Sequence, residues 1–95
     1  MESGVYIIQS IKNGYYYVGS TNNLVRRLSQ HNSGLVRATR NIRPLELKCF
    51  ISCANLTEAK QFEYRLKSYK RKDILEKIIK DKIFPWVYKA RVAQW

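Results

Sequence analysis

Residues 14–34 read GYYYVGSTNNLVRRLSQHNSG, and the rest of the chain is interpreted from this stretch. Strand-forming residues at 15–18 follow an Asn-Gly dipeptide and predict a β-strand. Residues 20–23, STNN, offer several helix N-caps, and Gly34 offers a left-handed helix stop, so a helix is predicted between them. The polar side chains of the stretch should therefore be held by rigid elements.

The predicted helix carries two polar residues next to its apolar stripe. Leu24 and Leu28 mark the buried side, and Arg27 and His31 lie beside them at helical spacing, whereas Arg26 points to solvent. Arg27 either packs its stem and extends its head to water or has a function. His31 either stabilises the helix dipole or takes part in a site.

The residues before this stretch predict a β-hairpin. Residues 4–11 form a β-branched and aromatic run, and Asn13-Gly14 suggests a two-residue loop that pairs Ser10 with Tyr17 and Ile8 with Gly19. Alternation along the strands then gives two faces. One holds Tyr6, Ile8, Ser10, Tyr15, Tyr17 and Gly19, and the other holds Val5, Ile7, Ile11, Tyr16 and Val18.

A basic loop and a third strand follow. Residues 35–44 contain Arg37, Arg40 and Arg43, which suit either phosphate contacts or a solvated surface. Residues 45–52 alternate and predict a strand with one buried face, made by Leu45, Leu47, Cys49 and Ile51.

The second predicted helix starts at Thr57 and carries an acid on its buried flank. Ala59, Phe62, Leu66 and Tyr69 recur at helical spacing, and Glu63 lies among them. A carboxylate at such a position needs a partner. The partner is either Lys67, four residues on, or Arg27 or a divalent cation.

Asp73 and Glu76 resemble a capping box that starts a third helix, which Pro85 would stop. Its apolar residues are Ile74, Leu75, Ile78, Ile79 and Ile83. From about residue 86 the chain either packs Trp86 and Trp95 against the domain or forms a loose tail. The order β-β-α-β-α-α predicts a single α+β domain over residues 1–95, with a three-stranded antiparallel sheet flanked by helices.

Composition points to a polyanionic partner. Eighteen Lys and Arg against seven Asp and Glu give a formal charge of +11, spread along the whole chain. Such a charge favours nucleic acid, because each neutralised phosphate releases counterions. No apolar run is long enough to span a membrane and no signal-peptide pattern opens the chain, so we expect a soluble cytoplasmic protein. Cys49 and Cys53 are expected to be reduced thiols.

Taken together, these residues resemble the GIY-YIG nuclease family. Gly4-Val5-Tyr6 is followed by Tyr17-Val18-Gly19, then by Arg27 and His31 on the next helix and Glu63 on the helix after the third strand. The short length and the run from residue 20 to Ala38-Thr39-Arg40 are similar to small stand-alone bacterial members and to the nuclease domain of the excision-repair incision subunit.

The resemblance implies an endonuclease that cuts DNA phosphodiester bonds with one Mg²⁺ or Mn²⁺ ion, directed by DNA structure in repair or processing. Tyr6 would take a proton from the attacking water, and Tyr17 would orient groups at the site. Arg27 would contact the scissile phosphate, His31 would assist proton transfer or phosphate contact, and Glu63 would ligate the metal. A phenol with a pKa of about 10 is a weak base near neutrality, so Arg27 or the metal should make Tyr6 lose its proton more easily.

Nucleic-acid contacts are expected from Ser20, Arg26, Arg37, Arg40 and Arg43. RNA remains a possible ligand, and the sequence gives no oligomeric state. Ser20 stands where the incision-subunit branch usually has a lysine, and no asparagine follows the third predicted helix, where many members place one. The alternative function is therefore a basic nucleic-acid-binding module that keeps the fold but has weak or lost catalysis. A peripheral membrane protein is disfavoured, because no basic amphipathic helix with an aromatic face is present.

Overall fold

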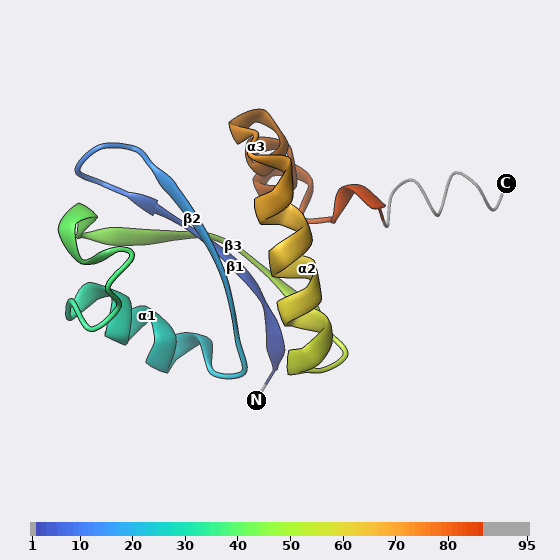
Figure 1. Ribbon diagram of the computed structural model, residues 1–95, viewed down its shortest axis with the longest axis horizontal. Coiled ribbons are helices and arrows are strands. Elements are labelled where there is room, and N and C mark those ends of the chain that lie inside the picture. Colours follow the sequence, from blue (N-terminus) through green and yellow to red (C-terminus); the bar gives the residue numbers. More distant parts are fainter. Residues whose placement is uncertain (1, 87–95) are drawn as a thin grey trace, which may run out of the picture.

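The computed structural model describes residues 2–86 and shows a three-stranded antiparallel sheet with helices on both faces (Figure 1). The order is β-β-α-β-α-α, as predicted, and β1 lies between β2 and β3. The elements are β1 (Ser3–Ser10), β2 (Tyr16–Thr21), α1 (Leu24–Asn32), a 3-10 turn (Arg40–Ile42), β3 (Leu45–Cys53), α2 (Leu56–Tyr69) and α3 (Lys72–Asp81). The α+β prediction is confirmed, and Trp95 lies outside the described residues.

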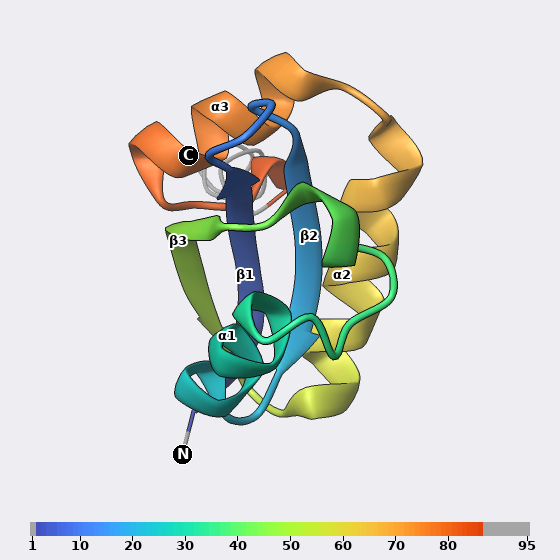
Figure 2. The same cartoon turned by 90° about the vertical axis from the view of Figure 1, so that its left-hand side faces the viewer.

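The sheet separates two apolar clusters, because α1 covers one face and α2 and α3 cover the other (Figures 1 and 2). The α2–α3 side contains Val5, Ile7, Val18, Cys49, Ala59, Leu66, Ile78 and Phe84. The α1 side is smaller and contains Tyr6, Ile8 and Leu45, with Tyr17, Leu24, Leu28, Ile42 and Phe50 packed around them. The phenol of Tyr6 therefore lies inside a core.

The hairpin differs from the prediction in its loop. Tyr6 pairs with Gly19 and Ile8 pairs with Tyr17, so the register is shifted by two residues and the loop has four residues, 11–14. The Ser10 hydroxyl accepts two N–H groups of this loop, and Gly14 supplies a φ of 80°. A shift of two keeps every strand side chain on its predicted face. Ile11, however, lies in the loop and is 63% exposed, so its assignment to a face of the hairpin was wrong.

The single buried face expected for β3 was also wrong. The register jumps between Ile7 opposite Cys49 and Ile8 opposite Leu47, so Lys48 is the extra residue of a β-bulge. Residues of the same alternating set point to opposite faces of the sheet before and after the bulge. Leu45 therefore packs with the α1-side cluster, whereas Cys49 packs with the α2–α3 side.

Helix boundaries depend on caps that differ from those predicted. α2 begins at Leu56, one residue before Thr57, because the side chain of Asn55 accepts the N–H of Glu58. α3 begins at Lys72 without a side-chain cap, so the predicted capping box of residues 73 and 76 is wrong. The Asp73 carboxylate instead takes two hydrogen bonds from Arg71, of 2.6 and 3.1 Å.

The described chain ends in an aromatic cluster. Ile83 lies beyond α3, which ends at Asp81. Trp86 stacks on Phe84 with ring centroids 4.8 Å apart and contacts Phe62, so this tryptophan packs against the domain. Of the helices in residues 2–86, none has the length and apolar character that crossing a membrane requires.

Candidate active site

A chain of hydrogen bonds joins β1, α1 and the loop after α1. The Tyr6 hydroxyl, in the middle of β1, lies 2.7 Å from Nε2 of His31 and accepts a 3.3 Å hydrogen bond from Nε of Arg27. Nδ1 of His31 lies 2.7 Å from Oγ1 of Thr39. Tyr6, His31 and Thr39 are each 1% exposed or less. Three of the four polar groups are therefore shielded from water, and the fourth, Arg27, is half-buried.

Gly19 makes room for Tyr6 on the sheet. The two residues face each other across β1 and β2, and a Cβ built on Gly19 would overlap the ring and hydroxyl of Tyr6. Gly19 is thus required sterically by Tyr6, because only a residue without a side chain leaves room for the tyrosine ring at this position.

The local sequence of α1 explains how Arg27 and His31 reach Tyr6. Asn23 caps the helix by accepting the N–H of Arg26, and Arg27 and His31 follow one turn apart on the side facing the sheet. The Arg27 guanidinium also donates to Gln30 at 3.0 Å. The guanidinium is therefore held against Tyr6 and Gln30. The interpretation in which Arg27 extends its head into water does not fit these hydrogen bonds.

His31 is neutral at physiological pH. Burial, with a smaller contribution from the Arg27 charge, lowers the pKa of His31 to about 4. An uncharged imidazole gives little stabilisation to a helix C-terminus, so the helix-dipole interpretation of His31 is wrong.

Thr39 was missed as a site residue by the sequence interpretation. It belongs to the Ala38-Thr39-Arg40 run that contributes to the family resemblance, but it was given no role. A threonine in a basic loop carries no sequence signal for burial. The Thr39 side chain is nevertheless fully buried and hydrogen-bonded to the imidazole of His31, eight residues earlier. The 3-10 turn that follows, Arg40–Ile42, keeps this part of the loop against the α1 face.

Tyr17 connects the imidazole to α2. Its ring meets the His31 ring edge-on with centroids 5.3 Å apart. The Lys67 ammonium lies 5.0 Å from the centre of the Tyr17 ring. Tyr17 therefore lies between the buried chain and the charged groups of α2.

Glu63 is half-buried, with 22% of its side chain exposed, and both of its oxygens have partners. Oε1 accepts a 2.5 Å hydrogen bond from the Ser20 hydroxyl, and Oε2 forms a 2.6 Å ion pair with Lys67. The helical ion pair with Lys67 is thus present, and the hydrogen bonds of the carboxylate do not go to Arg27. Ser20, predicted to contact nucleic acid, thus links Glu63 to β2, where the neighbouring Gly19 packs against Tyr6.

The pKa of Tyr6 is raised above its ordinary value, with burial as the largest cause. Arg27 acts in the opposite direction but does not compensate for burial, and Tyr17 and Glu63 raise the pKa further. The expectation that Arg27 makes Tyr6 lose its proton more easily is therefore not met by the protein's own residues. Tyr6 is protonated, and because its oxygen accepts from Arg27, its O–H can donate to Nε2 of His31.

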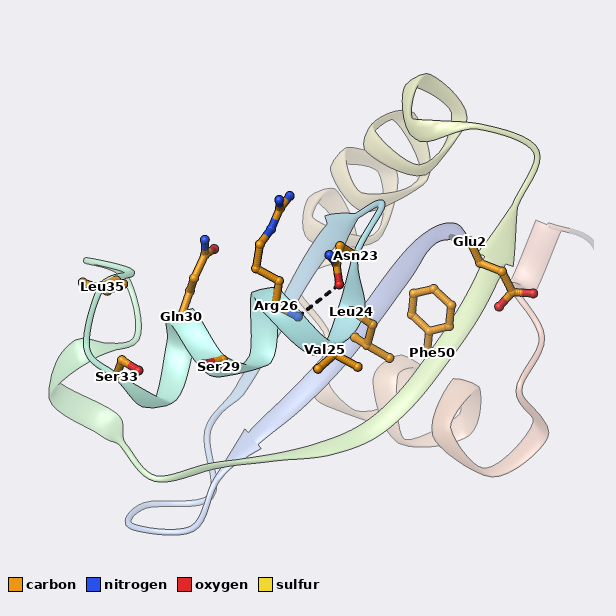
Figure 3. A pocket seen from close by; sticks show the side chains of 10 residues that line it. All are labelled: Glu2, Asn23, Leu24, Val25, Arg26, Ser29, Gln30, Ser33, Leu35 and Phe50. Atoms are coloured by element: carbon orange, nitrogen blue, oxygen red, sulfur yellow. Dashed lines mark hydrogen bonds between the residues drawn. The ribbon is translucent and has the colours of Figure 1, made fainter.

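The four predicted DNA-contacting arginines lie outside this hydrogen-bonded chain and are exposed. Arg40 and Arg43 line one surface hollow together with Lys12 and Asn32. Arg26 lines another, formed by α1 and Phe50 of β3 (Figure 3). Neither hollow is lined by the predicted catalytic residues.

Within residues 2–86 no group of three or more His, Cys, Asp or Glu side chains is placed to hold a metal ion. The predicted ligand, Glu63, is therefore not part of a group of three or more such side chains among the described residues. The five predicted catalytic residues nevertheless form one connected group. Tyr6, His31 and Arg27 are hydrogen-bonded, Tyr17 contacts His31, and Lys67 joins Tyr17 to Glu63.

Comparison with known proteins places this group in a family. Residues 2–82 match the model of the GIY-YIG catalytic domain. A "Structure-specific endonuclease subunit SLX1" of Podospora anserina is 45% identical over 69 residues, which is 65% of this chain and 20% of that protein. A "UPF0213 protein" of Bacillus pumilus is 47% identical over 60 residues, covering 62% of this chain and 61% of the relative.

A second "UPF0213 protein", from Clostridium perfringens, is 37% identical over 75 residues, covering 78% of this chain and 80% of the relative. The chain thus spans about a fifth of the SLX1 subunit and about three fifths of the Bacillus protein. No solved structure matches the chain significantly. Because the family model covers most of the described residues and all five residues of the connected group, the chain belongs to the GIY-YIG family.

Proposed function

We propose that the protein is a metal-dependent endonuclease of the cytoplasm that hydrolyses DNA phosphodiester bonds, directed by DNA structure during repair or processing. The observation that carries the proposal is the buried chain from Arg27 through Tyr6 and His31 to Thr39. Tyr6, within this chain, packs against Gly19, and the next residue, Ser20, donates a hydrogen bond to Glu63. The family match and the name of the Podospora anserina relative support it.

Tyr6 passes a proton in this mechanism and does not hold a negative charge. An attacking water gives its proton to the Tyr6 oxygen while the Tyr6 proton passes to Nε2 of His31, which lies 2.7 Å from that oxygen. The water oxygen forms a bond to phosphorus, the bond to the leaving oxygen breaks, and the leaving oxygen takes a proton from solvent. Tyr6 is neutral before and after the step, so its raised pKa is no obstacle.

His31 accepts that proton against its own lowered pKa, so substrate must assist. A phosphate next to Arg27 brings negative charge, which favours the imidazolium and raises the pKa of His31 from about 4. Thr39 accepts the hydrogen bond of Nδ1–H and fixes the tautomer whose Nε2 is free. Arg27 stabilises the charge that develops on the phosphate oxygens.

Glu63 fits the needs of one Mg²⁺ or Mn²⁺ ion. Mg²⁺ commonly keeps several waters and uses one or two carboxylates together with substrate phosphates. A carboxylate has about four acceptor sites, so each oxygen of Glu63 can take a second partner besides Ser20 or Lys67. A bound ion would supply positive charge that neutralises the phosphate and makes water more acidic.

A binding module without catalysis remains the second candidate, and one observation favours it. The Lys67 ammonium, 2.6 Å from Glu63, occupies one oxygen of the predicted metal ligand and competes with a cation for it. The charge of +11 and the exposed arginines would support DNA binding in either case.

Nicking assays separate the two candidates. Duplex, flap and branched DNA, and an RNA of the same shape, are incubated with Mg²⁺, Mn²⁺ or EDTA. We expect ion-dependent nicking that Glu63→Gln lowers at least about 100-fold, with DNA affinity in EDTA nearly unchanged. Glu46→Gln, at an exposed position of β3, removes the same charge and should stay active. A wild type that nicks nothing would establish the binding module, and an active Glu63→Gln would refute the assigned ligand.

A further inference from the structure

A groove of about 440 Å³ runs between β2 and the end of α2, next to the candidate active site. Figure 2 shows α2 behind and beside β2, which is an edge strand of the sheet. Three consecutive tyrosines, Tyr15 to Tyr17, line the groove on the strand side. On the helix side it is lined by cationic residues, which are Lys67, Lys70, Arg71 and Lys72.

The tyrosines of the groove differ in what covers them. The Lys67 ammonium lies over the Tyr17 ring at 5.0 Å, and the Lys72 ammonium lies over the Tyr16 ring at 5.7 Å. Tyr15, which also lines the groove, is 67% exposed. An exposed aromatic ring of this kind offers a face to a planar group from solution.

The charges of the groove are only partly neutralised. Lys67 pairs with Glu63 and Arg71 pairs with Asp73. Lys70 and Lys72, by contrast, form no ion pair with any residue in the described part of the chain. Lys70 has a φ of 52° where α2 ends, so the helix stops there and α3 restarts at Lys72 beside the same groove. The groove therefore keeps free positive charge beside an exposed ring.

We infer that this groove binds an unpaired strand of DNA that continues from the candidate active site. The inference rests on the proposed function, because Tyr17 and Lys67 belong to both places. Free positive charge favours a phosphate backbone, and an exposed tyrosine stacks on a base. In a duplex both faces of each base are already stacked, so only an unpaired base can use Tyr15.

Fluorescence anisotropy in EDTA tests the inference without cleavage. The probes are a labelled oligothymidylate and a labelled duplex of the same length, titrated with the protein at several salt concentrations. The test variants are Tyr15→Ala and the pair Lys70→Gln with Lys72→Gln. The matched controls are Tyr64→Ala, at an exposed tyrosine outside the groove, and the pair Lys60→Gln with Lys80→Gln.

We expect Tyr15→Ala to weaken oligothymidylate binding between about fivefold and 100-fold, with little change for the duplex. The double lysine variant should lower the salt slope for the single strand by about 1.4, since each lost phosphate contact removes about 0.7. The control variants should bind the single strand more tightly than their groove counterparts.

Equal losses for single strand and duplex, or equal losses for groove and control variants, would overturn the inference. Its failure is distinguishable from failure of the proposed function. A protein that nicks DNA but whose groove variants bind like the wild type refutes only the groove, whereas a protein that never nicks but shows the expected binding losses refutes only the nuclease.

Discussion

The lowered pKa of His31 predicts that the protein loses stability between about pH 6.5 and pH 4. An unfolded histidine has a pKa near 6.5, whereas His31 in the fold has a pKa of about 4. Within this window the unfolded state binds more protons, so acidification favours unfolding. The contribution is complete above pH 6.5 and is lost as the pH falls through 4. A difference of about 2.5 pH units corresponds to roughly 3 kcal/mol.

Urea unfolding at a series of pH values from 7.5 to 4, followed by circular dichroism, measures this loss. Carboxylates also titrate in this range, so the comparison needs His31→Gln, which cannot gain a proton there. The wild type should lose about 3 kcal/mol more than this variant between the two ends of the series. The protein contains one histidine, so NMR can follow its imidazole without assignment. Parallel stability curves together with an imidazole that titrates near pH 6.5 would refute the buried hydrogen-bond chain.

Two substitutions test the packing around the same chain. Gly19→Ala places a methyl group where the Tyr6 ring lies, so it should cost about 1–3 kcal/mol in urea unfolding and nearly abolish nicking; a variant with wild-type activity would contradict this geometry. Thr39→Val keeps the shape but leaves the buried imidazole nitrogen unpaired, at a cost of about 1–3 kcal/mol. Thr39→Ser keeps the hydroxyl, so its stability and the pH profile of its nicking activity should match those of the wild type. If Thr39→Ser behaved like Thr39→Val, the methyl group of Thr39 and not its hydroxyl would be the group that matters.

The strand and helix order followed from sequence because local signals agreed with the final fold. Asn13-Gly14 marked the hairpin, and Gly34 marked the helix stop, where both glycines have positive φ. The errors arose where a side chain changed the local geometry. The Ser10 hydroxyl stabilises a longer loop, and the bulge at Lys48 moves β3 residues between faces. A period-2 pattern carries no signal for an inserted residue.

The site could be predicted in part for a similar reason. Arg27 and His31 share a helix edge, and helical spacing alone brings them together. Which strand tyrosine meets them depends on how α1 lies across the sheet, and only the family resemblance pointed to Tyr6. Thr39 and the Ser20–Glu63 bond join segments distant in sequence through single hydroxyls. Neither composition nor periodicity encodes such contacts.

The cost of the buried chain bears on the choice between nuclease and binding module. A histidine, a threonine and a tyrosine hydroxyl inside the α1-side core require mutual hydrogen bonds, because a buried polar group without a partner is destabilising. Apolar residues of the same shape would fill this core without burying any polar group that needs a partner. DNA binding by the exposed cations would be unaffected. The arrangement also keeps a neutral imidazole nitrogen against a phenol that Arg27 touches from the other side. A module that only binds DNA makes no use of that alignment, whereas proton transfer from water to an imidazole requires it.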